Sequence, residues 1–293
     1  MNDRPRYSIL SNVSRSDLAL EPYPHLVIEN AIDAEMFSEL ERTFPADDIV
    51  VDNRPVKDTW YDYPACKVVN DTRLTPLWRE FFRYHTSTAF FHELVLVAGD
   101  ALRSVNPDLE ARIGRTLAEA KVGMRPGGRG DPLAPGADVS MECQFYVNYT
   151  RQPRVVRGPH VDRPSELFAA LFYFRQHDDT SEGGGLQICE ATSDILGDPR
   201  SVRIAELPAE IDPKCARIVR RVPYKANTLV LFLNSERSLH SVAPRSATPL
   251  TRRHVNFCCD INSELFDIRL PPRLKFKKIL KDTPVAWRLA RYV

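Results

Sequence analysis

The pattern of apolar and polar positions predicts a short strand followed by helices in the N-terminal part of the chain. Residues 24–29 form a brief apolar run typical of a strand. Asp33 is a suitable helix cap for the segment that follows it. Apolar residues then recur at helical spacing: Met36, Phe37, Leu40 and Phe44. Residues 75–122 keep a helical pattern, interrupted at Asn106-Pro107, and their wide apolar faces predict packing on a sheet.

The C-terminal half follows a different pattern of short, β-like runs separated in several places by glycine or proline turns. These runs are residues 139–149, 167–174, 186–189, 217–222, 228–233 and 254–261. Before them, residues 123–136 hold five glycines and three prolines, which predicts a surface loop of the kind that often acts as a lid. The repeated short strands indicate an all-β sandwich or barrel.

We therefore expect an α+β protein with one catalytic domain over residues 24–262. In it, helical residues 24–122 support a jelly-roll core at 139–262, and a glycine- and proline-rich loop at 123–138 joins the two parts. A polar leader, 1–23, precedes this domain, and a basic tail, 263–293, follows it.

Composition adds that the protein is globular and carries no strong overall charge. Of the 293 residues 43% are hydrophobic, and the formal net charge is +1, which offers no general field for nucleic acid. The six cysteines include no C-x-x-C pair and two are adjacent, so we expect buried thiols in a reducing compartment. No apolar run suits a secretory signal or a membrane span, which favours a cytoplasmic location.

Candidate chemistry centres on the segment Gly158-Pro159-His160-Val161-Asp162. In an extended chain, His160 and Asp162 point to the same side and can reach one ion. His240 follows the apolar run 229–233 and supplies a third ligand. Two histidines and a carboxylate form the facial triad suited to iron(II) oxygenases. One H-x-D pair is weak in a chain with seven histidines, but the order and context of all three residues make chance improbable.

These features resemble the 2-oxoglutarate/iron(II) dioxygenases, nearest the prolyl-4-hydroxylase-like branch, over about residues 139–261 and more loosely 24–45. The resemblance implies a double-stranded β-helix, with iron(II), 2-oxoglutarate and O2 as cofactor and cosubstrates. It also implies that Arg252 holds the distal carboxylate of 2-oxoglutarate, because Arg252, His254 and Asn256 then share a strand face; Arg253 is the alternative.

The same resemblance assigns further residues around the cosubstrate. Tyr173 matches a tyrosine whose hydroxyl contacts the same carboxylate, and Tyr149 matches a second pocket tyrosine. An aromatic residue in a β-run is also often a core residue. The run Gly183-Gly184-Gly185 matches a glycine turn with an architectural role. His254 is either a neighbour of the site or an ordinary satisfied polar group, and we expect His85 and His92 to be structural.

The resemblance implies hydroxylation of an unactivated C–H bond in a small molecule or saccharide, with release of succinate and CO2. The carboxylate Asp162 speaks against a related halogenase. Alternatives are a prolyl-type protein hydroxylase and a cupin-like metalloenzyme that does not use 2-oxoglutarate; a non-catalytic module would have lost a ligand. The substrate and the oligomeric state stay open.

The C-terminal tail raises one further alternative. Residues 269–293 carry eight lysines and arginines against one acid, with Trp287, Leu289 and Tyr292 among them. Such a stretch can lie on an anionic membrane surface, or it can form a helix docked on the core. A peripheral membrane contact would make a membrane-borne glycan substrate attractive.

Overall fold

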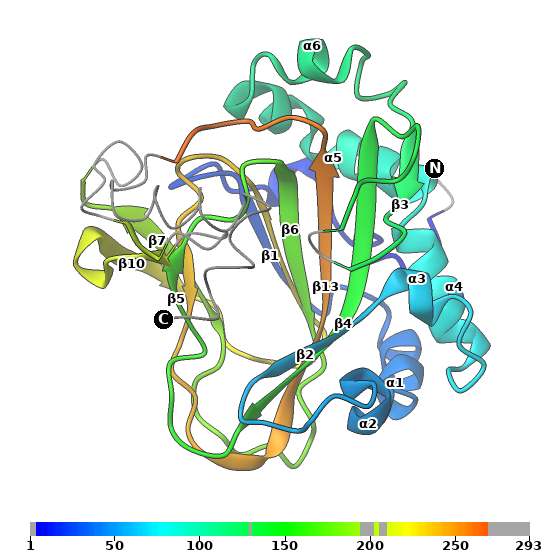
Figure 1. Ribbon diagram of the computed structural model, residues 1–293, viewed down its shortest axis with the longest axis vertical. Coiled ribbons are helices and arrows are strands. Elements are labelled where there is room, and N and C mark those ends of the chain that lie inside the picture. The colour runs from blue at the N-terminus through cyan, green and yellow to red at the C-terminus, as the bar shows by residue number, and fades with distance from the viewer. Residues whose placement is uncertain (1–3, 129–130, 194–201, 205–209, 269–293) are drawn as a thin grey trace, which may run out of the picture.

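The computed structural model describes residues 4–128, 131–193, 202–204 and 210–268 (Figure 1). The helices are α1 (Ala34–Arg42), α2 (Asp47–Val51), α3 (Ala65–Val68), α4 (Pro76–His85), α5 (Thr88–Val105) and α6 (Leu109–Ile113), with 3₁₀ turns at Arg15–Asp17 and Pro213–Cys215. The strands are β1 (His25–Glu29), β2 (Trp60–Pro64), β3 (Val122–Met124), β4 (Val139–Thr150), β5 (Arg157–His160), β6 (Glu166–Tyr173), β7 (Leu186–Ala191), β8 (Val202–Ile204), β9 (Glu210–Ile211), β10 (Ala216–Arg221), β11 (Thr228–Leu233), β12 (His240–Val242) and β13 (Thr248–Ile261).

Two β-sheets organise these strands. The larger sheet has the order β1-β11-β6-β13-β4-β2, and β3 pairs with β4 in parallel. The smaller sheet has the order β10-β7-β12-β5-β9-β8. Apart from β3, the recorded pairings are antiparallel. The β-rich C-terminal half is therefore confirmed.

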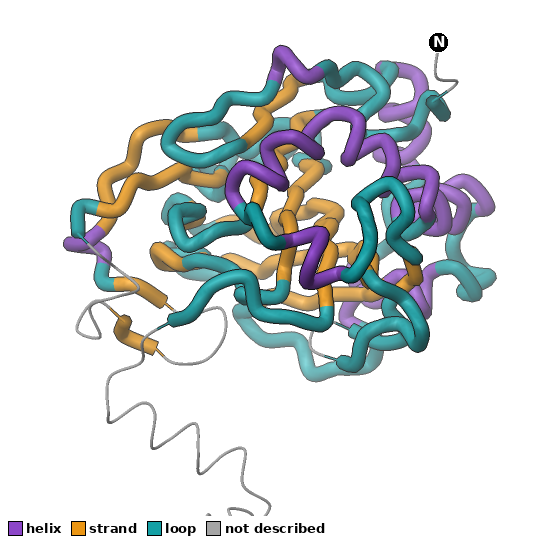
Figure 2. Tube along the Cα trace, turned by 90° about the horizontal axis from the view of Figure 1, so that it is seen from above, coloured by secondary structure: helices purple, strands orange, loops and turns teal. Residues whose placement is uncertain are grey.

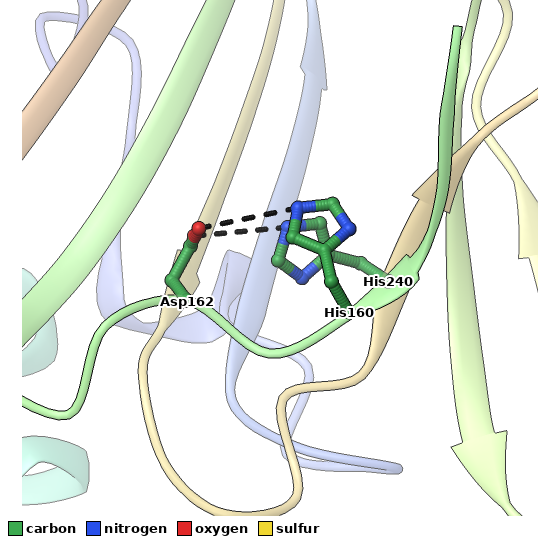
Figure 3. A group of neighbouring side chains, drawn as sticks. All are labelled: His160, Asp162 and His240. Atoms are coloured by element: carbon green, nitrogen blue, oxygen red, sulfur yellow. Dashed lines mark ion pairs between the residues drawn. The ribbon is translucent and has the colours of Figure 1, made fainter. Parts of the chain in front are cut away.

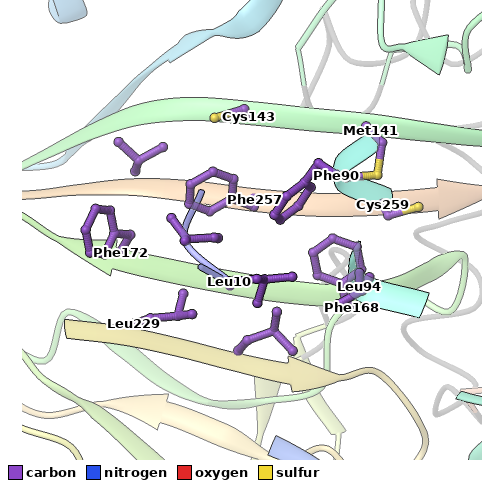
Figure 4. Close-up of a cluster of buried hydrophobic side chains, with 14 of the residues drawn as sticks. Leu10, Phe90, Leu94, Met141, Cys143, Phe168, Phe172, Leu229, Phe257 and Cys259 are labelled. Carbon is purple, nitrogen blue, oxygen red and sulfur yellow. The ribbon is translucent and has the colours of Figure 1, made fainter. Parts of the chain in front are cut away.

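The helices gather on one side of the molecule and cover the larger sheet (Figure 2). Ring centroids of Phe82 in α4 and Phe145 in β4 are 4.5 Å apart, and Phe90 of α5 lies 6.3 Å from Phe257 of β13. Figure 4 shows Phe90 among the strand side chains of this main core. Burying each such side chain contributes roughly 1.5–3 kcal/mol, so packing of the helices fixes the larger sheet.

A second, smaller core contains residues of both sheets. It includes Tyr173 of β6 and Phe232 of β11 from the larger sheet, and Leu186 and Ile188 of β7 from the smaller one. Side chains alternate along a strand, so each strand of the larger sheet sends one face to the helices and the other to the smaller sheet. That second face is the one that borders the site.

Local sequence signals explain where the helices begin. The Asp33 carboxylate accepts hydrogen bonds from the backbone N–H groups of Glu35 and Met36, which confirms it as the cap of α1. That helix ends at Arg42, so Phe44 lies beyond it. The expected helical stretch is divided by Ser87, whose hydroxyl caps α5, as well as near Asn106.

The expected helical pattern does not extend to residue 122. Gly114, with φ of 75°, ends α6, and β3 begins at Val122. The first two residues of the loop predicted at 123–138 therefore belong to β3. The next residue, Arg125, is buried and makes ion pairs with Glu142 and Asp260. This end of the loop is tied to the sheet, whereas residues 129–130 lie outside the described residues.

The polar leader predicted at residues 1–23 is packed on the domain where it is described. Ile9 and Leu10 are fully buried, and the Ser8 hydroxyl donates to the Glu93 carboxylate of α5 at 2.6 Å. Three apolar side chains within the segment, including Val13, enter the main core. The N-terminal segment is therefore continuous with the domain.

Two further expectations concern cysteines and membranes. All six cysteines are free thiols; four are buried, and Cys66 and Cys215 are half-buried. Within the described residues, the helices fall short of the length and apolarity that crossing a bilayer demands. The basic tail at 269–293 lies outside the described residues, so its membrane contact stays a prediction.

Candidate metal centre

Pairing of two short strands brings the predicted metal ligands together. His160 ends β5 and His240 begins β12, and these residues are direct partners across the antiparallel pair. Residues opposite one another point to the same face of a sheet, and the two imidazole ring centroids are 4.2 Å apart. Asp162 follows two residues after His160. Its carboxylate oxygens lie 4.0 Å from His160 Nε2 and 3.7 Å from His240 Nε2 (Figure 3).

Backbone carbonyls set the orientation of both imidazoles. His160 Nδ1 is 2.8 Å from the Gly158 carbonyl oxygen, and His240 Nδ1 is 2.8 Å from that of Ser238. A carbonyl only accepts, so each Nδ1 carries the hydrogen and each Nε2 presents a lone pair. Both Nε2 atoms face the carboxylate of Asp162. Histidines that bind a metal usually donate their other ring N–H in this way, which fixes the orientation of the ring.

Burial keeps the group in the state that binds a cation. The three side chains are buried, and one ligand atom from each lies within 4.8 Å of the others. Burial, with the neighbouring His240, holds the pKa of His160 well below its usual range, so this imidazole is neutral. Two neutral nitrogens and one carboxylate on one side of an ion match the donor set of non-haem iron(II). The residues present therefore fit the metal predicted from the sequence.

The triad borders a cavity of roughly 530 Å³, and Arg252 of β13 lies in its wall. This arginine is 2% exposed. Its Nε donates to the Gly184 carbonyl oxygen at 2.6 Å and its Nη1 donates to His254 Nδ1 at 3.1 Å, whereas Nη2 has no hydrogen-bond partner. Among the described residues no carboxylate forms an ion pair with it. A buried guanidinium with a spare donor is a receptor for an anion.

The aromatic ring of Tyr173 packs against the guanidinium of this arginine. The Arg252 guanidinium lies 5.1 Å from the Tyr173 ring centroid, within range of a cation–π contact. The Tyr173 hydroxyl accepts a hydrogen bond from the Leu186 backbone N–H at 3.2 Å. Tyr173 is fully buried and belongs to the core between the sheets. Its contact with a bound carboxylate stays a prediction.

The glycine run has the expected architectural role, and it also reaches the site. Gly183 and Gly184 have φ of 78° and 76°, values that side chains other than glycine rarely adopt. The turn they form presents the Gly184 carbonyl to Arg252. It therefore aims the guanidinium into the cavity.

The structure separates Arg252 from the two weaker candidates. Arg253 points to the other face of β13, where it pairs with Asp47 at 3.0 Å and covers the Phe44 ring. Tyr149 also lies on the other face of its strand, packed on the main core with its ring 5.9 Å from that of Tyr61. The expectation of Tyr149 in the pocket is therefore corrected, because side chains alternate along β4 and its neighbour Asn148 takes the inward position.

Several cavity residues were given no role by the sequence analysis. The Tyr146 ring stacks on that of His254 at 5.0 Å, and the Trp60 ring stacks on Tyr146 at 5.5 Å. Asn256 and Arg163 also line the cavity. Alternation along β4 could have indicated Tyr146, and the face shared with Arg252 indicated Asn256. Trp60 comes from an edge strand 86 positions away from Tyr146, and no local signal connects the two.

Comparisons with known proteins give matches among solved structures only. No protein-family model and no curated protein matches the chain. A prolyl-4-hydroxylase from Pseudomonas putida shares 12% identity, with a TM-score of 0.42 and coverage of 88% of this chain and 100% of the other. Prolyl 4-hydroxylase from Phytophthora capsici shares 16%, with a TM-score of 0.46 and coverage of 98% and 79%. HygX from Streptomyces hygroscopicus, solved with nickel and 2-oxoglutarate bound, shares 10%, with a TM-score of 0.40 and coverage of 81% and 82%.

Proposed function

We propose that this chain is a mononuclear non-haem iron(II) oxygenase on a double-stranded β-helix (jelly-roll) fold, with 2-oxoglutarate and O2 as cosubstrates. The observation that carries the proposal is the combination of two features in one cavity. His160, Asp162 and His240 form a complete facial donor set, and Arg252 presents a buried guanidinium nitrogen without a hydrogen-bond partner. A metal site alone would explain the first feature but not the second.

Each residue has a role that follows from its contacts. His160 and His240 bind the metal through Nε2, because their Nδ1 atoms are held by backbone carbonyls. Asp162 would supply a negative charge that offsets part of the charge of the bound cation. Arg252 binds the distal carboxylate of 2-oxoglutarate through charge-assisted hydrogen bonds. Tyr173 and the Gly184 carbonyl hold that guanidinium in place.

The metal, when bound, supplies coordination positions for 2-oxoglutarate and O2 and drives the oxidative decarboxylation that is coupled to C–H oxidation. The products are succinate, CO2 and a hydroxylated substrate, which accounts for both oxygen atoms of O2. The substrate we propose is a small molecule or saccharide. The cavity of roughly 530 Å³ has the size of a small-molecule pocket. Phe232 helps to exclude water around the ligands, since its ring lies 4.3 Å from that of His240.

The alternatives make different use of the same residues. A cupin-like metalloenzyme needs the metal ligands but not the spare donor of Arg252. A prolyl-type protein hydroxylase needs both, together with a surface that accepts an extended peptide. Binding of 2-oxoglutarate therefore separates the first alternative from our proposal, and the substrate separates the second.

The test measures iron content, 2-oxoglutarate binding and succinate formation in purified full-length protein. His160→Ala and His240→Ala should each lose stoichiometric iron and 2-oxoglutarate turnover, because two remaining ligands hold the ion poorly. His92→Ala is the matched control, since His92 is exposed on α5 and far along the chain from the triad. Iron binding without 2-oxoglutarate binding in the unaltered protein would favour the cupin-like alternative. Full iron occupancy in both triad variants would contradict the proposal.

A further inference from the structure

Two arginines of the cavity wall, Arg252 and Arg163, have no acidic partner among the residues that the structure describes. Asp62 pairs with Arg54 at 3.0 Å, and Arg157 lies 3.8 Å from Glu210. Asp162 belongs to the metal ligands, and Arg252 is assigned to 2-oxoglutarate. Arg163 lines the same cavity and is half-buried, yet it forms no ion pair with any residue that the structure describes.

A neighbouring cavity does not provide that partner either. Arg163 also borders this second space, whose acidic residues are Asp131, Asp260 and Glu264, and it forms an ion pair with none of them. The Asp260 carboxylate already accepts from Arg125 and from the Ser165 hydroxyl at 2.7 Å. The Arg163 guanidinium is therefore the positive group that remains for a ligand in the metal-site cavity, directly after Asp162 in the chain.

Two other groups in the wall suit the uncharged part of a ligand. Trp60 is 48% exposed at the edge of the larger sheet, and its ring stacks on Tyr146, which in turn stacks on His254. A stacked, partly exposed indole offers a flat apolar face to a ring. Asn256 is 8% exposed, and its side-chain Nδ2 is buried without a hydrogen-bond partner. It offers a neutral donor to a hydroxyl or carbonyl oxygen.

Asn256 cannot serve the same carboxylate as Arg252. The two residues are four positions apart on β13, which corresponds to about 13 Å along a strand. Along β13 the wall therefore has a cosubstrate end at Arg252 and a region further along that contains Asn256. Trp60 is aligned with Arg252 through Asn148, and its ring reaches toward Asn256 by stacking on Tyr146. Arg163 directly follows the metal ligand Asp162 and makes none of the contacts that hold Arg252.

We infer that the substrate is a small molecule whose ring carries a carboxylate or phosphate group, with Arg163 binding the anion, Trp60 stacking on the ring and Asn256 donating to a ring substituent. This inference rests on the proposed function, because it assumes that Arg252 is occupied by 2-oxoglutarate. Either a carboxylate or a phosphate would accept charge-assisted hydrogen bonds from Arg163, and the experiment below distinguishes the two.

The experiment measures binding of matched ring compounds to full-length protein loaded with iron(II) and saturating 2-oxoglutarate under nitrogen. Phenylacetate is compared with phenylacetamide, and glucose 6-phosphate with glucose, by isothermal titration calorimetry. At least one anion should bind about tenfold or more tightly than its neutral partner, as a charge-assisted hydrogen bond predicts. The pair that shows this preference identifies carboxylate or phosphate.

Variants assign the preference to residues. Arg163→Gln should bring the ratio within each pair close to one, whereas Arg163→Lys should keep most of it. Trp60→Ala should weaken the charged and neutral probes by the same factor. Arg42→Gln, which removes an exposed charge from α1, is the control and should change nothing.

The outcomes separate this inference from the proposed function. Loss of iron or 2-oxoglutarate binding in the unaltered protein contradicts the proposed function. Normal loading with no anion bound more tightly than its neutral partner overturns the substrate inference alone. The same holds if Arg163→Gln retains the full preference.

Discussion

The guanidinium of Arg252 donates to Nδ1 of His254, two residues further along β13, at 3.1 Å. An arginine only donates, so His254 must accept at Nδ1 and carry its hydrogen on Nε2. Burial and the adjacent Arg252 hold the pKa of His254 well below its usual range, which keeps the imidazole neutral. His254 is thus part of the frame that holds Arg252.

The strand register yields a paired prediction for 2-oxoglutarate. Arg252→Gln should raise its dissociation constant at least about tenfold, because a buried carboxylate then loses charge-assisted bonds worth roughly 1.5–3 kcal/mol each. Arg253→Gln should leave it nearly unchanged, since that guanidinium pairs with Asp47 on the other face. Calorimetric titration of the iron-loaded proteins under nitrogen measures both. The opposite ranking would mean that Arg253 binds the cosubstrate.

Tyr173 allows a graded test of how that guanidinium is supported. Tyr173→Phe keeps the ring under Arg252 but removes the hydroxyl, which accepts from the Leu186 N–H and also interacts with the Arg252 side chain. We expect 2-oxoglutarate binding to weaken less than in Arg252→Gln, and iron content to stay unchanged. A loss as large as that of Arg252→Gln would mean that the hydroxyl is needed as much as the guanidinium, and not only the ring beneath it.

Much of the fold was predictable because local patterns determine it. The six β-runs expected in the C-terminal half correspond to β4, β6, β7, β10, β11 and β13, and Asp33 caps α1 as expected. Two strands of the larger sheet, β2 and β3, were missed. In β2 the aromatic residues alternate with Asp62 beside a proline, and its stability comes from pairing with β4 some 80 residues later.

The site residues also differ in whether a local pattern determines their position. His160, Asp162 and Arg252 could be predicted because a two-residue spacing on a strand fixes which side chains share a face. Tyr149 was expected in the pocket, but the alternation of side chains along β4 places its neighbour Asn148 there instead. Arg163 could not be recognised from sequence, because its significance depends on which carboxylates already have partners.

His85 predicts a pH dependence of stability outside the site. It is fully buried, accepts from the Ile9 N–H at Nε2 and donates from Nδ1 to the Phe81 carbonyl. Burial lowers its pKa to about 3, against about 6.5 in an unfolded chain. Between these values the unfolded chain binds a proton that the folded protein does not. The free energy of unfolding should therefore fall as pH drops below about 6.5, by up to about 1.4 kcal/mol per pH unit from this residue.

Urea denaturation at pH 7.5, 6.5 and 5.5 measures this contribution. His85→Gln keeps an acceptor for Ile9 and should have a shallower pH slope than the unaltered protein, whatever its stability at pH 7.5. His92→Gln, at an exposed position of α5, should keep the original slope. Equal slopes in all three proteins would show that His85 protonates as readily in the folded state as in the unfolded one.

The glycine turn links stability to cosubstrate binding. Gly183 and Gly136 both have positive φ, of 78° and 71°, so replacement by alanine strains either backbone by about 1–2 kcal/mol. A Cβ on Gly183 would also lie 1.7 Å from the Pro244 carbonyl oxygen, whereas one on Gly136 meets nothing within 4 Å. Gly183→Ala must therefore displace the turn whose next carbonyl, that of Gly184, holds Arg252.

We expect a clearly lower Tm in Gly183→Ala than in Gly136→Ala, together with weaker 2-oxoglutarate binding at a temperature where both variants are folded. Thermal unfolding and calorimetric titration of the two variants measure these effects. Equal decreases in Tm and in 2-oxoglutarate affinity in the two variants would show that the turn adjusts without disturbing Arg252.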